Sequence, residues 1–255
     1  MRHSKLLILL ATVVVLSACG GGNVAVTPVP TTTQSTPTAE VTGLNGIWEG
    51  DYTDSSGTVC TDVKGLTYNG SVRVISEKCN LVLAGTLSVN GGNANIDFDL
   101  FDTTGVGAGQ SVFSGSFTQK SSIDGSLDNG GRLSLRYQTV YENDSSLTYI
   151  NSRWVMSDGK SLYFFTVDID GSIASQAAPG GCNYTGSISI IDTQYDLYGI
   201  DLTVKDCSGN YAARNGNFSG IGALLEGNKI FRMLVGNAQT TFFVELNNVS
   251  VGQSN

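Results

Sequence analysis

The sequence has very little histidine: its one histidine is His3, close to the start. Hydrolases built on a Ser-His-Asp or Cys-His arrangement need a histidine base. The Gly-x-Ser-x-Gly motif that surrounds the nucleophilic serine of many serine hydrolases is also absent. Two acidic side chains can still hydrolyse a glycosidic bond without histidine. We therefore predict a protein that is not an enzyme and needs no cofactor, and we keep a carboxylate-dependent hydrolase as an alternative.

Charged residues are scarce, at 14% of the chain, and acidic residues outnumber basic ones by 22 to 14. An excess of negative charge is unfavourable next to nucleic-acid phosphates and next to the headgroups of anionic lipids. The composition therefore argues against nucleic acid as a partner and against docking on a membrane through a basic patch.

Long apolar runs are absent as well. The most apolar stretch, Leu6–Leu16, falls short of the ~20 residues that a membrane-spanning helix needs. It follows the basic residues Arg2 and Lys5, and a basic tip before a short apolar run is typical of a secretory signal peptide. We therefore expect an exported chain whose signal peptide covers residues 1–18.

The apolar run ends in Leu16-Ser17-Ala18-Cys19, which resembles the lipobox of bacterial lipoproteins. The resemblance implies that the Cys19 thiol carries diacylglycerol and that the new amino-terminal amine is acylated, for example by palmitate. Gly20 stands where inner-membrane lipoproteins often have aspartate, so the resemblance implies an outer-membrane location. It does not decide between the periplasmic face and the cell surface. Removing Arg2 and Lys5 leaves 12 basic against 22 acidic residues, a formal net charge of −10. A plain secretory signal is the alternative.

Proline is rare outside one segment, since three of the four prolines lie between Gly20 and Thr42. Threonine and glycine fill the rest of that segment, which cannot bury a core. Residues 19–42 are therefore predicted to form a lipidated, disordered tether with a root-mean-square span of roughly 25 Å.

Glycine, by contrast, is abundant, with 32 residues. After residue 43, apolar and polar residues alternate with period two, as in Leu133–Tyr137 and Tyr198–Val204, which is the pattern of a half-buried strand. Pairs of Asn or Asp with Gly suit tight hairpin turns. These pairs begin at Asn69, Asn90, Asp124, Asn129, Asp158 and Asp170. We predict an all-β antiparallel meander of one or two small barrels or sandwiches, in which only Asn217–Glu226 offers a short helix.

Two faint repeats indicate two related units. Leu44–Trp48 is similar to Ile150–Trp154, and Tyr68–Ile75 is similar to Tyr184–Ile191. We therefore predict two β-domains, a first at 43–143 and a second at 146–249.

Gly46-Ile47-Trp48 resembles the Gly-x-Trp that opens the first strand of lipocalins, where the tryptophan closes one end of a barrel. That resemblance implies a barrel rather than a sandwich. Residues 114–246 also resemble a group of exported bacterial lipoproteins of unknown function, which implies a β-domain and no particular activity. The residues that carry this second likeness are Gly181–Ile188, Leu197-Tyr198, Leu202–Val204, Asn217–Gly220 and Phe242–Leu246.

Four cysteines follow Cys19, and an even number in an exported chain indicates two disulfides. Hairpin geometry pairs the neighbours, through a two-residue turn at Asn69-Gly70 and a four-residue loop at Thr193–Asp196. The predicted disulfides are Cys60–Cys79 and Cys182–Cys207. A tetracysteine zinc site is the alternative, although zinc ligands usually come in close Cys-x-x-Cys pairs.

This pairing conflicts with the apolar pattern of the strands. Bringing Ile188 and Ile200 onto one face of the second hairpin requires a register one residue away from the one that aligns its cysteines. We therefore expect a β-bulge there, and a similar slip in the first hairpin.

The acidic residues form three clusters that a metal ion could in principle use. They are Glu49, Asp51 and Asp54; Asp97, Asp99 and Asp102; and Asp168 and Asp170. Asp97 and Asp99 alternate with apolar residues as on a solvated strand face, and Asp168–Gly171 is typical of a hairpin turn. We predict no metal site, with Asp97, Asp99, Asp102, Asp168 and Asp170 as the candidate calcium ligands.

Arginine is notable in so acidic a chain. Arg232 lies in Ile230–Leu234, which is apolar on both faces, so its head either reaches solvent past its neighbours or lines a cavity that binds an anion. Arg232 and Arg136 are the candidate ligand-binding residues.

Together these features favour a lipid-anchored, non-catalytic binding module for a small ligand in a barrel or for a protein partner. A structural or envelope-assembly role is the second hypothesis. Binding residues in β-folds gather in loops. The long Gly/Ser/Ala-rich loops expected to bind are Asp102–Gln110, Ser172–Gly181 and Cys207–Asn215.

Overall fold

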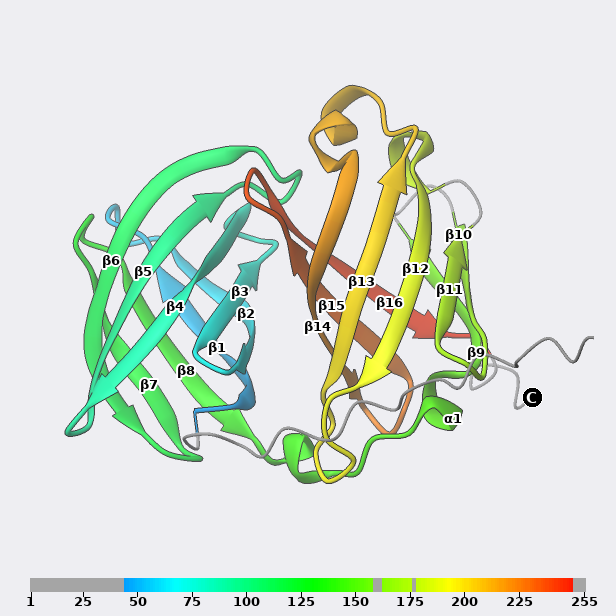
Figure 1. Ribbon diagram of the computed structural model, residues 1–255. Helices are drawn as coiled ribbons and strands as arrows, with labels where there is room; N and C mark the ends of the chain where they lie inside the picture. Colours follow the sequence, from blue (N-terminus) through cyan, green and yellow to red (C-terminus); the bar gives the residue numbers. More distant parts are fainter. Residues whose placement is uncertain (1–43, 158–161, 176–177, 250–255) are drawn as a thin grey trace, which may run out of the picture. The chain divides into compact units, whose positions relative to one another are not determined.

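The computed structural model describes residues 44–157, 162–175 and 178–249. Within them the chain forms two closed antiparallel barrels of eight strands each (Figure 1). Both barrels belong to the same compact unit of the chain. The predicted all-β meander is confirmed, with barrels and not sandwiches. The predicted signal peptide, Cys19 and the tether lie outside the described residues.

In the first barrel each strand pairs with the next along the chain, and the last strand pairs with the first. Its strands run from blue to green in Figure 1. They are β1 (Gly46–Thr53), β2 (Val59–Tyr68), β3 (Ser71–Ser76), β4 (Leu81–Asn90), β5 (Asn93–Phe101), β6 (Gly107–Thr118), β7 (Ser122–Leu127) and β8 (Arg132–Gln138).

The second barrel has the same order, and its first strand pairs with its last. Its strands are β9 (Ser152–Ser157), β10 (Leu162–Val167), β11 (Ser172–Ser175), β12 (Asn183–Ile190), β13 (Tyr198–Lys205), β14 (Gly216–Leu225), β15 (Ile230–Gly236) and β16 (Thr241–Asn248). The helical segments are short: η1 (Thr139–Glu142) and α1 (Leu147–Ile150) between the barrels, then η2 (Pro179–Gly181) and η3 (Gly209–Arg214).

Each barrel has a core packed with its own side chains. Along β5, Ile96 and Phe98 are buried, whereas Asp97 and Asp99 between and after them are exposed. The largest buried side chains are aromatic: Trp48, Phe98 and Phe113 in the first core, and Trp154, Phe165, Tyr184, Tyr198, Phe231 and Phe242 in the second. Eight strands enclose a space that side chains of this size fill.

A third apolar cluster, the junction cluster, is made by residues of both barrels and of the connecting segments. It contains Ile47, Leu66, Ile75, Val82, Ala84, Phe101, Tyr141, Leu197, Ile221, Ala223, Leu225 and Leu234. One face of β14 therefore packs in the barrel core, and the other packs in the junction cluster. The expectation of a short helix at Asn217–Glu226 is wrong, because this run is apolar on both faces of a strand.

The first of the two repeats marks equivalent strands. Trp48 lies in β1 and Trp154 in β9, the first strand of each barrel. Both indoles are fully buried, and each Nε1 donates a hydrogen bond, of 2.9 Å and 2.8 Å respectively. The second repeat is wrong: Tyr68–Ile75 covers the β2–β3 turn and β3, whereas Tyr184–Ile191 covers β12, the fourth strand of its barrel. Its Gly-x-Ser-aliphatic pattern reflects strand alternation and not position.

The predicted turns are largely present. Chain reversals occur at Asn69-Gly70, Asn90-Gly91, Asn129-Gly130 and Asp170-Gly171. Asp158-Gly159 lies outside the described residues. Asp124-Gly125 is wrong as a turn, because it lies inside β7, and the chain turns instead around Lys120, whose φ is 51°. Gly125 is required for close strand approach, since a Cβ there would lie 2.4 Å from the Ser114 carbonyl oxygen.

Both predicted disulfides, Cys60–Cys79 and Cys182–Cys207, are present. The β2–β3 ladder has no register shift, so the slip expected in the first hairpin is wrong. Leu66 and Ile75 do not have to face the barrel core, because the junction cluster buries them on the outer side.

The second hairpin takes the register that its apolar pattern requires. Ile188 pairs with Ile200, both are buried, and the connecting loop spans 191–197 instead of four residues. The disulfide lies just beyond this ladder. The expected β-bulge is absent from this ladder. The one-residue offset between the ladder and the cysteines lies after the ladder, at Asp206, whose φ is 63°. Aspartate tolerates this left-handed backbone better than most residues.

Candidate functional site

The acidic candidates form no common site. Asp97 and Asp99 are exposed on β5, and Asp99 accepts a hydrogen bond from Gln110 Nε2 at 2.8 Å. Asp168 and Asp170 both lie in the β10–β11 turn, in which the Gly171 N–H donates to the Asp168 carbonyl. No group of three or more His, Cys, Asp or Glu within the described residues is placed to hold a metal ion.

Asp102 organises its own turn. Its Oδ1 accepts hydrogen bonds from the backbone N–H groups of Thr104 and Val106, at 2.9 Å and 3.0 Å. Burial opposes ionisation of this carboxyl, but these bonds outweigh that effect and lower the pKa of Asp102. Asp102 therefore shapes the loop between β5 and β6.

The two candidate arginines have carboxylate partners in the protein. Arg136 pairs with Asp124 on the neighbouring strand, with Nη1 2.7 Å from Oδ1. Arg232 is only 3% exposed, and its Nε donates to Glu245 Oε2 at 3.1 Å. Its Nη1 lies 3.8 Å from Glu49 Oε1 of the first barrel. Arg232 thus joins the two barrels and lines neither of the clefts described below.

Of the three loops singled out from the sequence, two are shorter than predicted, because Gly107–Gln110 belongs to β6 and Ser172–Ser175 is β11. Described residues of all three segments still line one cleft beside the junction. Arg214 of η3 is 7% exposed and donates from Nη2 to the Thr103 carbonyl at 2.7 Å and from Nε to the Thr104 carbonyl at 3.4 Å. Thr240 Oγ1 donates to the carbonyl of Gly105 in the same turn. The loop between β5 and β6 of the first barrel is therefore held by the second barrel.

These loops line a cleft of about 450 Å³, which we call the loop cleft. Its lining residues are Ile75, Glu77, Thr103, Thr104, Met156, Ser157, Pro179, Tyr211, Arg214, Phe243, Glu245 and Asn247. The Arg214 guanidinium lies 4.8 Å from the centre of the Tyr211 ring. Apolar and aromatic walls with a few fixed polar groups are typical of ligand sites.

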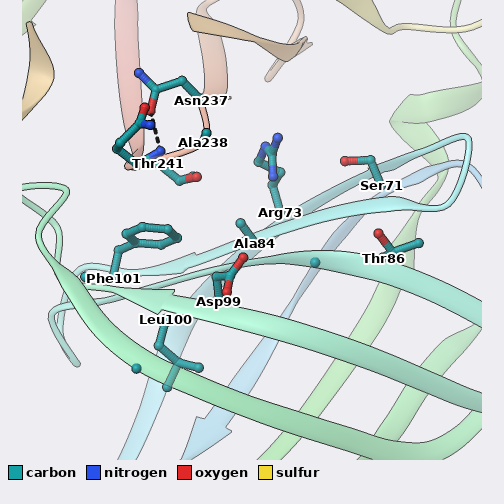
Figure 2. A pocket seen from close by; sticks show the side chains of 14 residues that line it. Ser71, Arg73, Ala84, Thr86, Asp99, Leu100, Phe101, Asn237, Ala238 and Thr241 are labelled. Carbon is teal, nitrogen blue, oxygen red and sulfur yellow. Dashed lines mark hydrogen bonds between the residues drawn. The ribbon is translucent and has the colours of Figure 1, made fainter. Parts of the chain in front are cut away.

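A second cleft, of about 470 Å³, is the Arg73 cleft shown in Figure 2. It is lined by strands β3 to β6 of the first barrel and by the β15–β16 turn and the start of β16 in the second. Its lining residues are Ser71, Arg73, Ala84, Gly85, Thr86, Asp99, Leu100, Phe101, Gly107, Gly109, Asn237, Ala238, Gln239 and Thr241. Figure 2 shows the Arg73 side chain standing off its strand toward the turn that carries Asn237 and Ala238.

The Arg73 side chain is partly shielded from solvent and has no hydrogen-bond or ion-pair partner among the described residues. Its Nε is buried and makes no hydrogen bond within the described part of the chain. Burial lowers the pKa of Arg73, but a guanidinium stays charged near neutral pH. The cleft therefore offers a positive charge that forms no ion pair with a described residue, in a partly desolvated place where electrostatic attraction is stronger than in water.

Comparisons with protein-family models, with curated proteins and with solved structures found no match for this chain. In the described ranges, no helix is both long enough and apolar enough to cross a membrane. The fold therefore defines the class: a double β-barrel protein with its clefts beside the junction of the barrels.

Sequence reasoning missed Arg73, which lies between two inward-facing valines and has the position of a solvated strand residue. Leu66 lies directly opposite Arg73 in the β2–β3 ladder, and Ile75 follows it on the same face of β3. Two apolar residues on an outer face indicate that the face is covered. That signal could have placed Arg73 at an interface.

Proposed function

We propose that this protein is a lipid-anchored envelope protein of the bacterial outer membrane that binds a small ligand or a protein partner and performs no chemistry on it. The anchor rests on the resemblance of Leu16–Cys19 to a lipobox. The binding role rests on one observation, the convergence of loops from both barrels on the loop cleft.

The packed cores direct this proposal to the junction and away from a ligand inside a barrel. Aromatic side chains such as Phe98 and Phe165 occupy the interiors, whereas the loop cleft is open and combines Met156, Phe243 and Tyr211 with polar groups. Its β5–β6 loop is already held by Arg214, so ordering this loop on binding costs little entropy. A preformed concave surface supports a binding role better than a purely structural one.

Site-specific photo-crosslinking in intact cells tests this proposal. Asn247 lines the loop cleft and is exposed, whereas Val59 is 57% exposed and lines neither cleft. Each is replaced, in the full-length chain, by the photo-reactive residue p-benzoylphenylalanine. We expect an ultraviolet-dependent adduct from position 247 and not from position 59, with its mass separating a small molecule from a protein.

Equal adducts at both positions, or none at position 247, would contradict binding at the loop cleft. The non-catalytic part has its own test with the purified protein. Turnover of a glycan or ester substrate that is lost when one acidic residue is replaced would contradict it.

A further inference from the structure

Three cationic side chains beside the junction have partners within the protein. Lys64 and Arg232 both contact Glu245, and Arg214 donates to two backbone carbonyls. Within the described residues the Arg73 guanidinium has neither an ion pair nor a hydrogen bond. Burying such a group without a partner costs free energy, and a ligand that pairs with it would offset that cost.

Uncharged hydrogen-bonding groups share the cleft with this guanidinium. The hydroxyl groups of Ser71, Thr86 and Thr241 and the side-chain amide of Gln239 line the same cleft. None of these four side chains makes a hydrogen bond to another described residue. Phe101 adds an apolar wall. The cleft thus presents unused donors and acceptors, a cation and an apolar surface together.

This set matches a ligand that carries a carboxylate on a hydroxyl-rich skeleton. A guanidinium binds a carboxylate through two parallel hydrogen bonds, hydroxyl and amide groups exchange hydrogen bonds with ligand hydroxyls, and an apolar wall packs against C–H groups. We propose that the Arg73 cleft binds a small acidic sugar, with the sugar carboxylate on Arg73. The cleft, at about 470 Å³, has the size of ordinary small-ligand sites. It is separate from the loop cleft and needs no contribution from it.

Asp99 explains why a single carboxylate fits better than a phosphate. Asp99 lines the same cleft, is exposed and accepts a hydrogen bond from Gln110. Its negative charge repels an anion in proportion to the charge of that anion, so a dianionic phosphate is disfavoured more than a carboxylate. Replacing Asp99 by asparagine removes the repulsion and leaves an oxygen that can still accept the bond from Gln110.

The test uses the purified soluble form, Cys19→Ser, and three probes at constant ionic strength: D-glucuronate, D-glucose and acetate. Two-dimensional NMR titration in a phosphate-free and sulfate-free buffer gives each dissociation constant. We expect glucuronate to bind more tightly than glucose or acetate, with shifts at the residues of the Arg73 cleft. Arg73→Gln should weaken glucuronate binding about tenfold or more, and Arg73→Lys should weaken it less. Asp99→Asn should strengthen it.

The control is Arg132→Gln, which removes one exposed positive charge on β8 away from both clefts and should leave glucuronate binding unchanged. Arg73→Gln removes an unsatisfied group, so we expect it to fold. Asp99→Asn provides a second readout of opposite sign. Glucose binding as tightly as glucuronate, acetate binding equally well, or no effect of Arg73→Gln would overturn the proposal. So would the absence of binding by any probe.

Discussion

At the residue scale, Arg232 illustrates how one buried charge can depend on one partner. Its guanidinium meets Glu245 at 3.1 Å, and the same carboxylate also meets Lys64 at 3.0 Å. Glu49, the other partner of Arg232, is half exposed and 3.8 Å away. Glu245 is therefore the residue on which two cations from different barrels converge.

This asymmetry predicts unequal costs for the two truncations. Glu245→Leu leaves the buried Arg232 with only a distant partner and should lower the free energy of unfolding by about 3 kcal/mol. Arg232→Met leaves Glu245 still paired with Lys64 and should cost clearly less. Urea denaturation of both variants measures the difference. Equal losses, or a larger loss for Arg232→Met, would contradict this account of the junction.

A second residue, Asp196, makes stability depend on pH. Asp196 is 2% exposed, and burial raises its pKa to about 7, although a hydrogen bond from the Leu224 N–H at 3.0 Å partly opposes this. Nearby Asp144 raises the pKa further. The folded state therefore holds a proton that the unfolded state loses near pH 4, so stability falls as pH rises from about 4 to about 7 and then levels off.

Asp196→Asn should remove this pH dependence while keeping an oxygen that can accept the bond from Leu224. At pH 8 we expect the variant to be the more stable protein, by at most about 4 kcal/mol. At pH 4 the two should differ little. Chemical denaturation at several pH values measures both slopes. Parallel slopes for the two proteins between pH 4 and 7 would show that Asp196 is not the group responsible.

At the element scale, the two disulfides have different surroundings. Cys60–Cys79 lies at the end of the β2–β3 hairpin. Cys182–Cys207 lies between η2 and η3, where Ser208 also donates from its N–H and its hydroxyl to the Gly180 carbonyl, at 2.8 Å each. The second disulfide therefore holds two of the loops that form the loop cleft.

Replacing each pair of cysteines by serine should lower stability by about 3 kcal/mol in the chain-entropy account. Only the Cys182→Ser/Cys207→Ser variant should also reduce photo-crosslinking from position 247. Non-reducing peptide mapping of the parent protein checks the pairing itself. A peptide that joins Cys60 or Cys79 to Cys182 or Cys207 would contradict the fold. Equal crosslinking by both variants would show that the Cys182–Cys207 disulfide is not needed to hold the loop cleft.

The strands and their turns could largely be predicted from the sequence, because period-two alternation and Asn-Gly or Asp-Gly pairs are local signals. The predictions that were wrong concern residues that are buried where the two barrels pack together. β14 was apolar on both faces, and Leu66 and Ile75 appeared to require a slip, because the surface that buries them is distant in sequence. The Arg73 cleft was missed for the same reason: Thr241 and Arg73 are brought together only by the packing of the two barrels.

At the scale of the whole molecule, we assign different roles to the described barrels and to the predicted anchor. The barrels provide two preformed clefts, and the anchor with its tether of roughly 25 Å would keep them close to a membrane while letting them reorient. With a formal charge of −10 after removal of the signal peptide, the barrels gain little from anionic lipid by charge attraction. Membrane association is therefore expected to depend on the lipid and not on the protein surface.

This expectation gives a direct prediction for Cys19→Ser. Without the thiol the chain cannot receive diacylglycerol, and each buried methylene of an acyl chain contributes about 0.8 kcal/mol to membrane binding. The variant should therefore appear in the soluble fraction, while the parent protein sediments with membranes and is released only by detergent. The matched control, Ser17→Ala, keeps a small residue in the lipobox and should still sediment. Cys19→Ser that stays with the membranes through a high-salt wash would contradict the lipid anchor, and it would move the search for the membrane contact to the surface of the barrels.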